Sequence, residues 1–408
     1  MKTKLALHWQ ILIAILIGGV FGYFFYDYTH YVKWAGDMFL RALKMIIIPM
    51  VFSSLVMGVA SIGKSSDLGR IAGKTFLFYI VTTLIAIVIG LSLVNIFQPG
   101  VGASTNFSES VEGIKATQVS FIDQIVGIIP DNIFAELANG NLLPIIFFSI
   151  LLGFFITKSN DKTRVMLTDL FNGFFDIIMQ ITLFVIKFTP IGVFAIVATM
   201  VGDQAGDHEK LIRVLSSLGF YTLIVWAGCL IHGLIVLPSI VYLLGKGNPW
   251  KHISQMSTAI LTAFSTCSSA AALPIALKDI QEKTGVSNKI ASFTLPPGAT
   301  VNMNGTALYE GVTVIFIAQA YGIDLSIGQE LMVVATVLMA AIGTASIPMA
   351  GLVMITVVLS VVGLPLEGIG LVLAVQQLCD MPRTAVNTYG NTCAAAVIAK
   401  SEGETLNI

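Results

Sequence analysis

The chain has 408 residues, of which 56% are hydrophobic and only 11% are charged. A soluble domain carries about 25% charged residues, so this composition excludes an ordinary soluble protein. The formal net charge of −1 gives no indication of a nucleic-acid partner. Apolar stretches recur along the whole chain, and a membrane span needs roughly 20 apolar residues. The sequence therefore predicts an all-α polytopic membrane protein.

The first predicted unit, residues 1–245, holds six membrane spans joined by short loops. No cleavable signal is evident, because MKTKLALHWQ runs directly into the first apolar stretch. The fourth span contains the polar run PDNIFAELANGN, so we expect breaks in it. The spans are predicted at 8–27, 38–61, 73–98, 120–157, 165–201 and 212–245.

The second predicted unit, residues 250–408, has a different pattern. Two runs of small residues, STCSSAAALP (265–274) and GTASIPMAGL (343–352), lie in segments too polar for ordinary spans. Basic residues on both sides of the first run place its two ends on the same side. We therefore predict a re-entrant hairpin there, and a second hairpin of opposite orientation at the other run.

Each predicted hairpin precedes a span with a polar centre, NMNGT (302–306) or DMPRTAVNTYGN (380–391). We expect both spans to be interrupted there. Non-helical backbone at membrane depth is tolerated only where it is buried in protein or lines a wet cavity. Paired interrupted segments in inverted repeats indicate the binding site of a transporter. We therefore predict that NMNGT is unwound and turns free carbonyls toward a ligand or an ion.

The distribution of basic residues predicts the orientation. Most of the 22 Lys and Arg residues fall in segments that lie inside if the N-terminus is cytoplasmic, which is the asymmetry expected of membrane proteins. Both termini are therefore predicted to be cytoplasmic.

Asp380 and Arg383, in the last span, are the foremost site candidates. A cation at the bilayer centre costs about 2.5–3.5 kcal/mol on insertion scales, so Arg383 needs an anionic partner. One interpretation is an internal ion pair with Asp380, three residues back on the same helix face. The other is that Arg383 binds a substrate carboxylate through its planar guanidinium, while Asp380 accepts a substrate ammonium. That combination suits an acidic amino acid.

Glu310 lies in the same span as NMNGT. A carboxyl group that is neutral when buried and charged when solvated is a candidate proton carrier. The structural alternative is a glutamic acid hydrogen-bonded to a neighbouring helix.

Four asparagines in these two spans offer amide oxygens to a substrate or a cation, or join helices, and their clustering favours a site: Asn302, Asn304, Asn387 and Asn391. On their own, three residues on one turn of the third span are interpreted as packing residues: Tyr79, Thr82 and Thr83.

No enzyme motif is present. The five histidines show no metal-ligand spacing, and GxSxG, Walker-type and HExxH patterns do not occur. The four cysteines lie in apolar segments and are interpreted as small buried hydrophobic residues. We expect no catalytic site, no cofactor and no certain metal site. With no phosphate loop, the energy for transport must come from an ion gradient.

Long motifs in order along the chain resemble the glutamate/aspartate transporter family, the dicarboxylate/amino acid:cation symporters. They are FLRALKMIIIPMVFSSLVMGVASIG (39–63), PDNIFAELANGNLLPIIFFSILLG (130–153), STCSSAAALP, NMNGT at the family's NMDGT position, IPMAGLVM (347–354) and DMPRTAVN (380–387). The resemblance covers essentially the whole chain. It implies eight transmembrane helices, two re-entrant hairpins, a homotrimer and an elevator mechanism. Spans 1, 2, 4 and 5 would form the scaffold, and spans 3 and 6 would move with residues 250–408.

The resemblance also implies roles for individual residues. Arg383 matches the arginine that binds the substrate's side-chain carboxylate, and Asp380 matches the aspartate that binds its amino group. Glu310 matches the glutamate that carries a proton in the mammalian relatives. Further positions match substrate contacts, the last two through the backbone of the outer hairpin: Thr384, Asn387, Thr306, Ser269, Ile347 and Gly351.

Two departures from the family concern the cation sites. Asn304 and Asn391 stand where the sodium-coupled members have aspartates, each a ligand of a separate sodium site. An amide in place of a carboxylate removes a full charge from a site for a hard cation. The resemblance also implies a third sodium site, which in the family consists largely of main-chain carbonyls and so does not depend on these side chains. The residual or degenerate cation sites would comprise Asn302, Met303, Asn304, Asn391, Tyr79, Thr82 and Thr83.

These patterns predict a prokaryotic symporter for glutamate and aspartate in the plasma membrane, coupled to protons, with sodium sites weakened or lost. A sodium-coupled glutamate/aspartate symporter and a proton-coupled C4-dicarboxylate carrier stay open as alternatives. Asp380 disfavours the dicarboxylate carrier, because a dianion without an amine would be repelled there. Arg383 disfavours a neutral amino-acid exchanger, since its guanidinium would lack a carboxylate partner. A channel would show linear rather than saturable flux.

Overall fold

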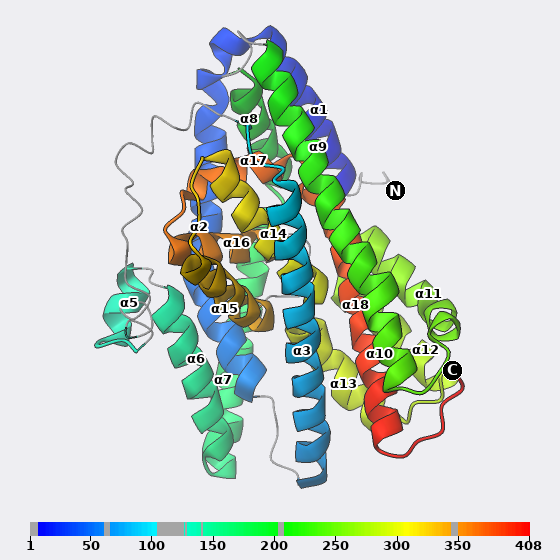
Figure 1. The fold of residues 1–408 in the computed structure, drawn as a ribbon. Coiled ribbons are helices and arrows are strands. Elements are labelled where there is room, and N and C mark those ends of the chain that lie inside the picture. The colour runs from blue at the N-terminus through cyan, green and yellow to red at the C-terminus, as the bar shows by residue number, and fades with distance from the viewer. Residues whose placement is uncertain are drawn as a thin grey trace, which may run out of the picture.

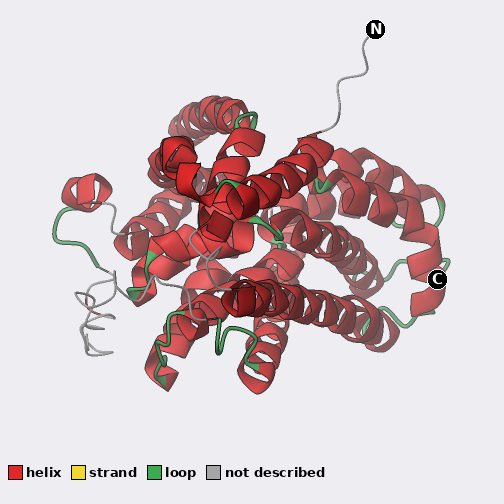
Figure 2. Cartoon of the chain, turned by 90° about the horizontal axis from the view of Figure 1, so that it is seen from above, coloured by secondary structure: helices red, strands yellow, loops and turns green. Residues whose placement is uncertain are grey.

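The computed structural model describes residues 7–60, 66–103, 126, 129–139, 142–202, 208–343 and 350–408. These residues form helices joined by turns and loops, and they contain no strand (Figures 1 and 2). The predicted all-α class is therefore confirmed for this part of the chain. Three stretches of helix in it are long and apolar enough to cross a membrane: Gly73–Phe97, Asp161–Val185 and Ile212–Leu243.

The chain begins with three helices, α1 (Leu7–Phe24), α2 (His30–Ala60) and α3 (Ser66–Phe97). A 3-10 turn (Tyr26–Tyr28) joins the first two. The predicted fourth span, 120–157, contains α5 (Ile133–Asn139) and α6 (Leu142–Lys158). Nearly all of its first ten residues lie outside the described part.

The predicted fifth span, 165–201, is divided into two helices. The structure has α7 (Asp161–Ile186) and α8 (Thr189–Gly202), separated at Lys187 and Phe188. Pro190 has no backbone N–H to donate to the end of α7, and it is tolerated in the first turn of a new helix. α8 packs against α1 and α2.

The sixth span is confirmed as an extended helical segment. α9 (His208–Ile231) passes through five π-helical residues (His232–Val236) into α10 (Leu237–Leu243). Short π-helical segments are rare and occur frequently at functional sites. The segment turns His232 into the interior, where its side chain is fully buried.

The second half opens with a helical hairpin, as predicted. α11 (Pro249–Thr266) and α12 (Ser269–Glu282) pack against each other, and Cys267 makes the turn with φ 51°. α13 (Asn288–Val301) and α14 (Asn304–Ala320) then follow, separated only by Asn302 and Met303. The predicted interruption is present but shorter than NMNGT, because Asn304 already begins α14.

α15 (Ile327–Gly343) and α16 (Ala350–Val362) flank the second run of small residues. Residues 344–349, which include Ile347, lie outside the described part. A 3-10 turn (Leu366–Gly368) and α17 (Ile369–Leu373) lead into α18 (Gln376–Ser401). α18 continues through 380–391, so the predicted interruption at its polar centre is wrong. Its polar side chains form hydrogen bonds with one another, with Asn302 in the α13–α14 break, with α14 and with Ser269 at the hairpin turn, while its backbone stays helical.

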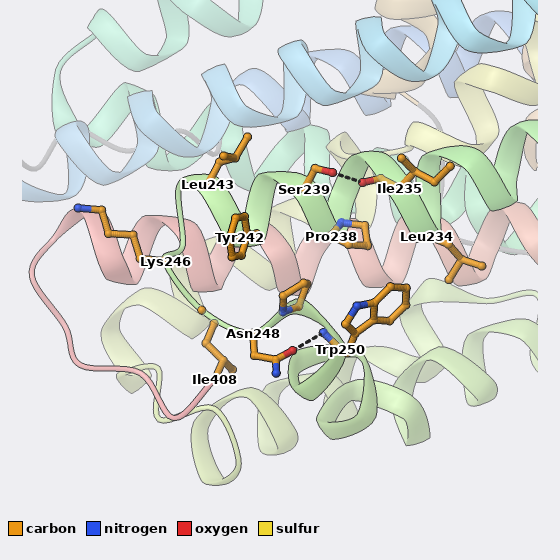
Figure 3. A pocket seen from close by; sticks show the side chains of 12 residues that line it. Leu234, Ile235, Pro238, Ser239, Tyr242, Leu243, Lys246, Asn248, Trp250 and Ile408 are labelled. Atoms are coloured by element: carbon orange, nitrogen blue, oxygen red, sulfur yellow. Dashed lines mark hydrogen bonds between the residues drawn. The ribbon is translucent and has the colours of Figure 1, made fainter.

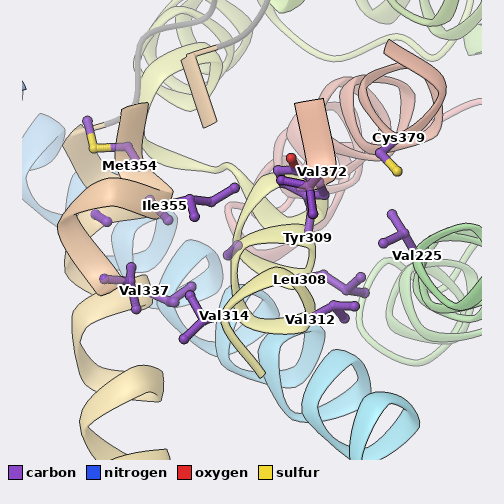
Figure 4. Close-up of a cluster of buried hydrophobic side chains, with 14 of the residues drawn as sticks. Val225, Leu308, Tyr309, Val312, Val314, Val337, Met354, Ile355, Val372 and Cys379 are labelled. Carbon is purple, nitrogen blue, oxygen red and sulfur yellow. The ribbon is translucent and has the colours of Figure 1, made fainter. Parts of the chain in front are cut away.

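α14 is enclosed on all sides. Every residue in it except Gln319 is buried, as expected of a helix that is apolar all round. α3, α9, α15, α16 and α18 pack around it. Figure 4 shows Leu308 and Val312 of α14 beside Val225 of α9, and Val314 beside Val337 of α15. Polar groups on α14 must therefore find partners inside the protein.

The helices fall into two groups by their packing. The first group packs mainly on itself and consists of α1, α2, α6, α7 and α8. The second group is centred on α14 and α18, and α3 and α9–α13 pack around these two helices (Figure 1). α15, α16 and α17 contact both groups. The polar residues predicted to form a site belong almost entirely to the second group.

Candidate functional site

The break between α13 and α14 is the place where the predicted site residues meet. Asn387 of α18 faces the first turn of α14. Its Oδ1 accepts hydrogen bonds from the backbone N–H of Gly305 at 2.8 Å and of Thr306 at 3.4 Å. Its Nδ2 donates to Thr306 Oγ1 at 2.9 Å. The first N–H groups of a helix have no acceptor within the helix, so Asn387 caps α14 from another helix.

Arg383 and Asp380 form a buried ion pair. Arg383 Nε donates to Asp380 Oδ1 at 2.8 Å, and both side chains are only 2% exposed. Thr384 Oγ1 donates to the same oxygen at 2.9 Å. The internal pair anticipated from the sequence is therefore present. This ion pair does not use all the hydrogen-bond donors of the guanidinium, because Nη1 has no hydrogen-bond partner among the described residues.

The surroundings of this guanidinium are narrow and partly aromatic. Arg383 Cζ lies 4.5 Å from the centroid of the Tyr309 ring, within the range of a cation–π contact. A Cβ on Gly351 would lie only 2.6 Å from Arg383 Nη1 and 3.1 Å from Thr306 Cγ2. The glycine therefore allows the backbone of α16 to approach the unpaired edge of the arginine.

The turn of the first hairpin contacts the same helix. Ser269 is buried, and Thr388 Oγ1 donates to its hydroxyl at 3.5 Å. Thr388 lies one turn beyond Thr384, so Ser269 meets the face of α18 that carries the ion pair. Gln377 Nε2 donates to Cys267 Sγ at 3.1 Å. These contacts hold the hairpin turn against α18.

Asn304, at the predicted first cation site, lies in a neutral hydrogen-bond network. Thr83 Oγ1 donates to Asn304 Oδ1 at 2.7 Å, and Asn304 Nδ2 lies 3.3 Å from His232 Nε2. Tyr79 instead donates its hydroxyl to the Thr294 carbonyl at 2.7 Å. The structure thus brings Thr83 to Asn304 as predicted.

Asn391, at the predicted second cation site, is joined to the break. Asn302 Nδ2 donates to Asn391 Oδ1 at 2.8 Å, and Asn302 Oδ1 has no partner among the described residues. A Cβ on Gly298 would lie 2.7 Å from Asn391 Oδ1 and 2.6 Å from the Tyr79 hydroxyl. The two predicted cation sites therefore border each other at Gly298. Thr82 Oγ1 donates to the Phe78 and Tyr79 carbonyls, both within α3.

Glu310 is fully buried in the first half of α14, one turn beyond Thr306. Neither carboxyl oxygen has a hydrogen-bond partner among the described residues, so the anticipated bond to a neighbouring helix is not found there. Burying a polar group without a partner is unfavourable, and such residues inside membrane proteins mark proton relays and ion pathways.

Three further polar residues were missed by the sequence analysis. His232 is one of five histidines without a common spacing, so the spacing does not single it out. Its position within an apolar span is the sequence feature that could have indicated a buried polar role. Tyr309 donates its hydroxyl to Gln376 Oε1, and both side chains are buried. Tyr309 adjoins Glu310, but nothing in the sequence pattern pairs it with Gln376. Among the described residues no group of three His, Cys, Asp or Glu side chains is placed to hold a metal ion.

Comparison with known proteins gives full-length matches. The profile of the sodium:dicarboxylate symporter family matches residues 7–401. A proton/sodium-glutamate symport protein of Bacillus caldotenax is 36% identical, over 98% of this chain and 96% of that protein. The proton/glutamate-aspartate symporter of Escherichia coli (strain K12) is 35% identical, over 98% and 94%. Excitatory amino acid transporter 3 of Oryctolagus cuniculus is 32% identical, over 98% and 86%.

Proposed function

Because the chain belongs to the sodium:dicarboxylate symporter family, we propose that it is a secondary active symporter that carries glutamate and aspartate across a membrane. Relatives named as glutamate or glutamate–aspartate symporters match it over nearly their whole length. The observation that carries the proposal is the buried Arg383, which is paired with Asp380 and whose Nη1 has no hydrogen-bond partner among the described residues. A guanidinium with a free edge binds a carboxylate, and the adjacent carboxylate attracts an ammonium.

The substrate would lie between α18, the first turn of α14 and the two hairpins. Its side-chain carboxylate would bind the free edge of Arg383, beside Thr306, and its amino group would bind Asp380. Backbone groups at Gly351 and Ile347 would close the outer side. The remaining polar contacts would come from Thr384, Asn387 and Ser269.

We propose coupling to protons, carried by Glu310. Two observations support this coupling. Glu310 is buried and neither of its carboxyl oxygens has a hydrogen-bond partner among the described residues, and the positions matching two sodium-site aspartates carry the neutral Asn304 and Asn391. Sodium coupling is the second candidate, because Thr83 still bonds to Asn304 and Tyr79 still reaches Gly298. The relatives include both proton/sodium and proton symporters by name.

The proposed architecture is eight spans and two re-entrant hairpins, with both termini cytoplasmic and three copies per assembly. Spans 1, 2, 4 and 5 would form the scaffold, and spans 3 and 6 would move with residues 250–408 as an elevator. The packing supports this division, since α3 packs on α14 while α1, α2, α6, α7 and α8 pack mainly on one another.

An ion-replacement assay tests the proposed coupling. The purified protein is reconstituted in liposomes, and aspartate and glutamate uptake is measured with a proton gradient or a sodium gradient alone. We expect saturable uptake with the proton gradient in sodium-free buffer. Strong uptake that requires sodium and ignores the proton gradient would select the sodium-coupled alternative. Inhibition by succinate at least as strong as by aspartate would select a dicarboxylate carrier, and non-saturable flux would indicate a channel.

A further inference from the structure

A cavity of about 1080 Å³ lies between the end of α10 and the start of α11. Figure 3 shows the side chains around it, which come from the π-helical segment, α10, the following loop and the first turn of α11. Ile408 forms part of its wall. None of the residues proposed to bind substrate or cations lines this cavity, so it is a separate feature of the molecule.

The apolar wall of the cavity has the length of one membrane leaflet. It runs from Leu234 to Leu243, the last part of the apolar stretch Ile212–Leu243 that is long enough to cross a membrane. Ten residues of helix extend about 15 Å, which is half of the hydrocarbon thickness of about 30 Å. The wall therefore matches the space that one acyl chain occupies in a single leaflet.

Several apolar side chains of this wall are exposed in the described part of the chain, although Pro238 is buried. Ile235 is 60% exposed and Leu243 67%. Tyr242 and Trp250 are 66% and 62% exposed, and they stand near the end of the apolar stretch. Tyrosine and tryptophan are enriched at this level of membrane proteins, where apolar chains give way to head groups.

The charge at the mouth of the cavity is positive. Lys246, just beyond the end of the apolar stretch, is the one charged residue among those lining the cavity, and it is exposed. Asn248 Oδ1 accepts hydrogen bonds from the N–H groups of Trp250 and Lys251, so its amide NH₂ remains as a second donor at the mouth.

We propose that this cavity binds a membrane phospholipid with an anionic head group. One acyl chain lies along Leu234–Leu243, and the phosphate meets the ammonium of Lys246 and the amide of Asn248. Lysine side chains extend to the membrane surface and attract anionic lipids there. The bound lipid bridges α10 and α11, and thereby connects the sixth span to the first hairpin.

The test compares lipids on the full-length protein after its native lipid has been removed in detergent. Binding of phosphatidylglycerol and phosphatidylcholine with the same acyl chains is measured by native mass spectrometry and by the shift in melting temperature. We expect phosphatidylglycerol to bind at least tenfold more tightly. Lys246→Gln should remove this preference, whereas Lys162→Gln, an exposed lysine at the start of α7, should leave it unchanged.

A second variant tests the apolar part independently of the charge. Ser239 is exposed in the wall, so Ser239→Trp should fill the groove and weaken both lipids. Equal binding of the two lipids in the wild-type protein and Lys246→Gln would overturn the proposal. It would also be overturned if inorganic phosphate alone gave the same thermal shift. Cross-linking of Tyr242→Cys to a second copy of the chain, with no lipid bound, would show that another protomer covers the cavity.

Discussion

At the scale of single residues, the site is a set of buried charges with incomplete partners. Arg383 and Asp380 bond to each other, yet Arg383 Nη1 and both oxygens of Glu310 lack partners among the described residues. Stable interiors satisfy nearly all buried polar groups. These two exceptions, Arg383 on α18 and Glu310 on α14, agree with a ligand and a proton that complete their contacts during transport.

Replacing Arg383 should weaken the binding of acidic substrates. Arg383→Gln eliminates the charge that faces the substrate carboxylate, and a charged hydrogen bond contributes about 1.5–3 kcal/mol. We expect apparent aspartate affinity in liposomes to fall by about tenfold to over a hundredfold. Arg164→Gln, at an ion pair on the surface of α7, should transport normally. Undiminished aspartate accumulation by a folded Arg383→Gln variant would refute the assigned substrate site.

Glu310→Gln should separate exchange from net uptake. The amide keeps the shape of the side chain but cannot carry a proton, so proton-driven accumulation should be lost while aspartate/aspartate exchange continues. Both are measured with radiolabelled aspartate in the same liposomes. Glu282→Gln, on the exposed end of α12, serves as the control. The proton role is falsified if Glu310→Gln retains full accumulation driven by the proton gradient.

Asn304→Asp should introduce sodium dependence. A carboxylate at this position places a full negative charge beside the Thr83 hydroxyl, 2.7 Å from the present amide oxygen, and hard cations prefer anionic oxygen ligands. We expect aspartate uptake to become a saturable function of sodium concentration. Thr83→Ala in the same background should reduce that dependence. A folded variant that is indifferent to sodium would show that this position does not control cation choice.

At the scale of elements, glycines set how closely α14 approaches its neighbours. A Cβ on Gly305 would lie 2.4 Å from the backbone oxygen of Arg383 and 2.7 Å from its Cα. A backbone cannot rotate away as a side chain can, so α14 and α18 would have to separate. The capping contact between Asn387 and the start of α14 depends on this approach.

Gly305→Ala should therefore destabilise the protein. Overpacking a tight contact typically costs about 1–3 kcal/mol, and a lowered melting temperature in detergent would report it. Gly219→Ala in α9 is the matched control, because a Cβ there meets nothing within 4 Å. Alanine favours helix by up to about 1 kcal/mol over glycine, so that variant should be neutral or slightly more stable. Equal melting temperatures for both variants would contradict the contact.

At the scale of the whole molecule, the last residues connect segments far apart in the sequence. Glu402 bonds to Arg70 at 2.5 Å and to Lys74 at 2.6 Å, both on α3. The Asn407 backbone N–H donates to the Thr284 carbonyl at 2.8 Å. The end of α18 is thus joined both to the third span and to the segment that follows the first hairpin.

This connection should weaken in acid. The hydrogen bonds from Lys74 and Arg70 hold the pKa of Glu402 below its ordinary value. A carboxyl with a lowered pKa in the folded state contributes stability above its unfolded pKa and loses that contribution as pH falls through the folded value. The melting temperature of Glu402→Gln should therefore be lower than wild type at pH 7, and the difference should shrink below about pH 4. A difference that stays constant from pH 7 to pH 3 would contradict the ion pairs.

The fold could be predicted from the sequence where a single local feature indicated the structure. Apolar length indicated the spans, and the small residues of STCSSAAALP indicated the turn at Cys267. Prediction failed where several arrangements satisfy the same pattern. The division between α7 and α8 depends on where a new helix packs against α1. The continuity of α18 depends on partners for its polar side chains in the α13–α14 break and on α14.

The sequence by itself determined that this is a helical membrane protein that carries Arg383, Asp380 and Glu310 within its second half, because charged residues within largely apolar stretches can be recognised without coordinates. Only the tertiary structure decided which of these groups have hydrogen-bond partners. It paired Asn304 with Thr83 and His232, set Gly351 against Arg383, and left Glu310 without a partner among the described residues. Such contacts join residues distant in the chain, and they depend on how closely packed helices approach one another.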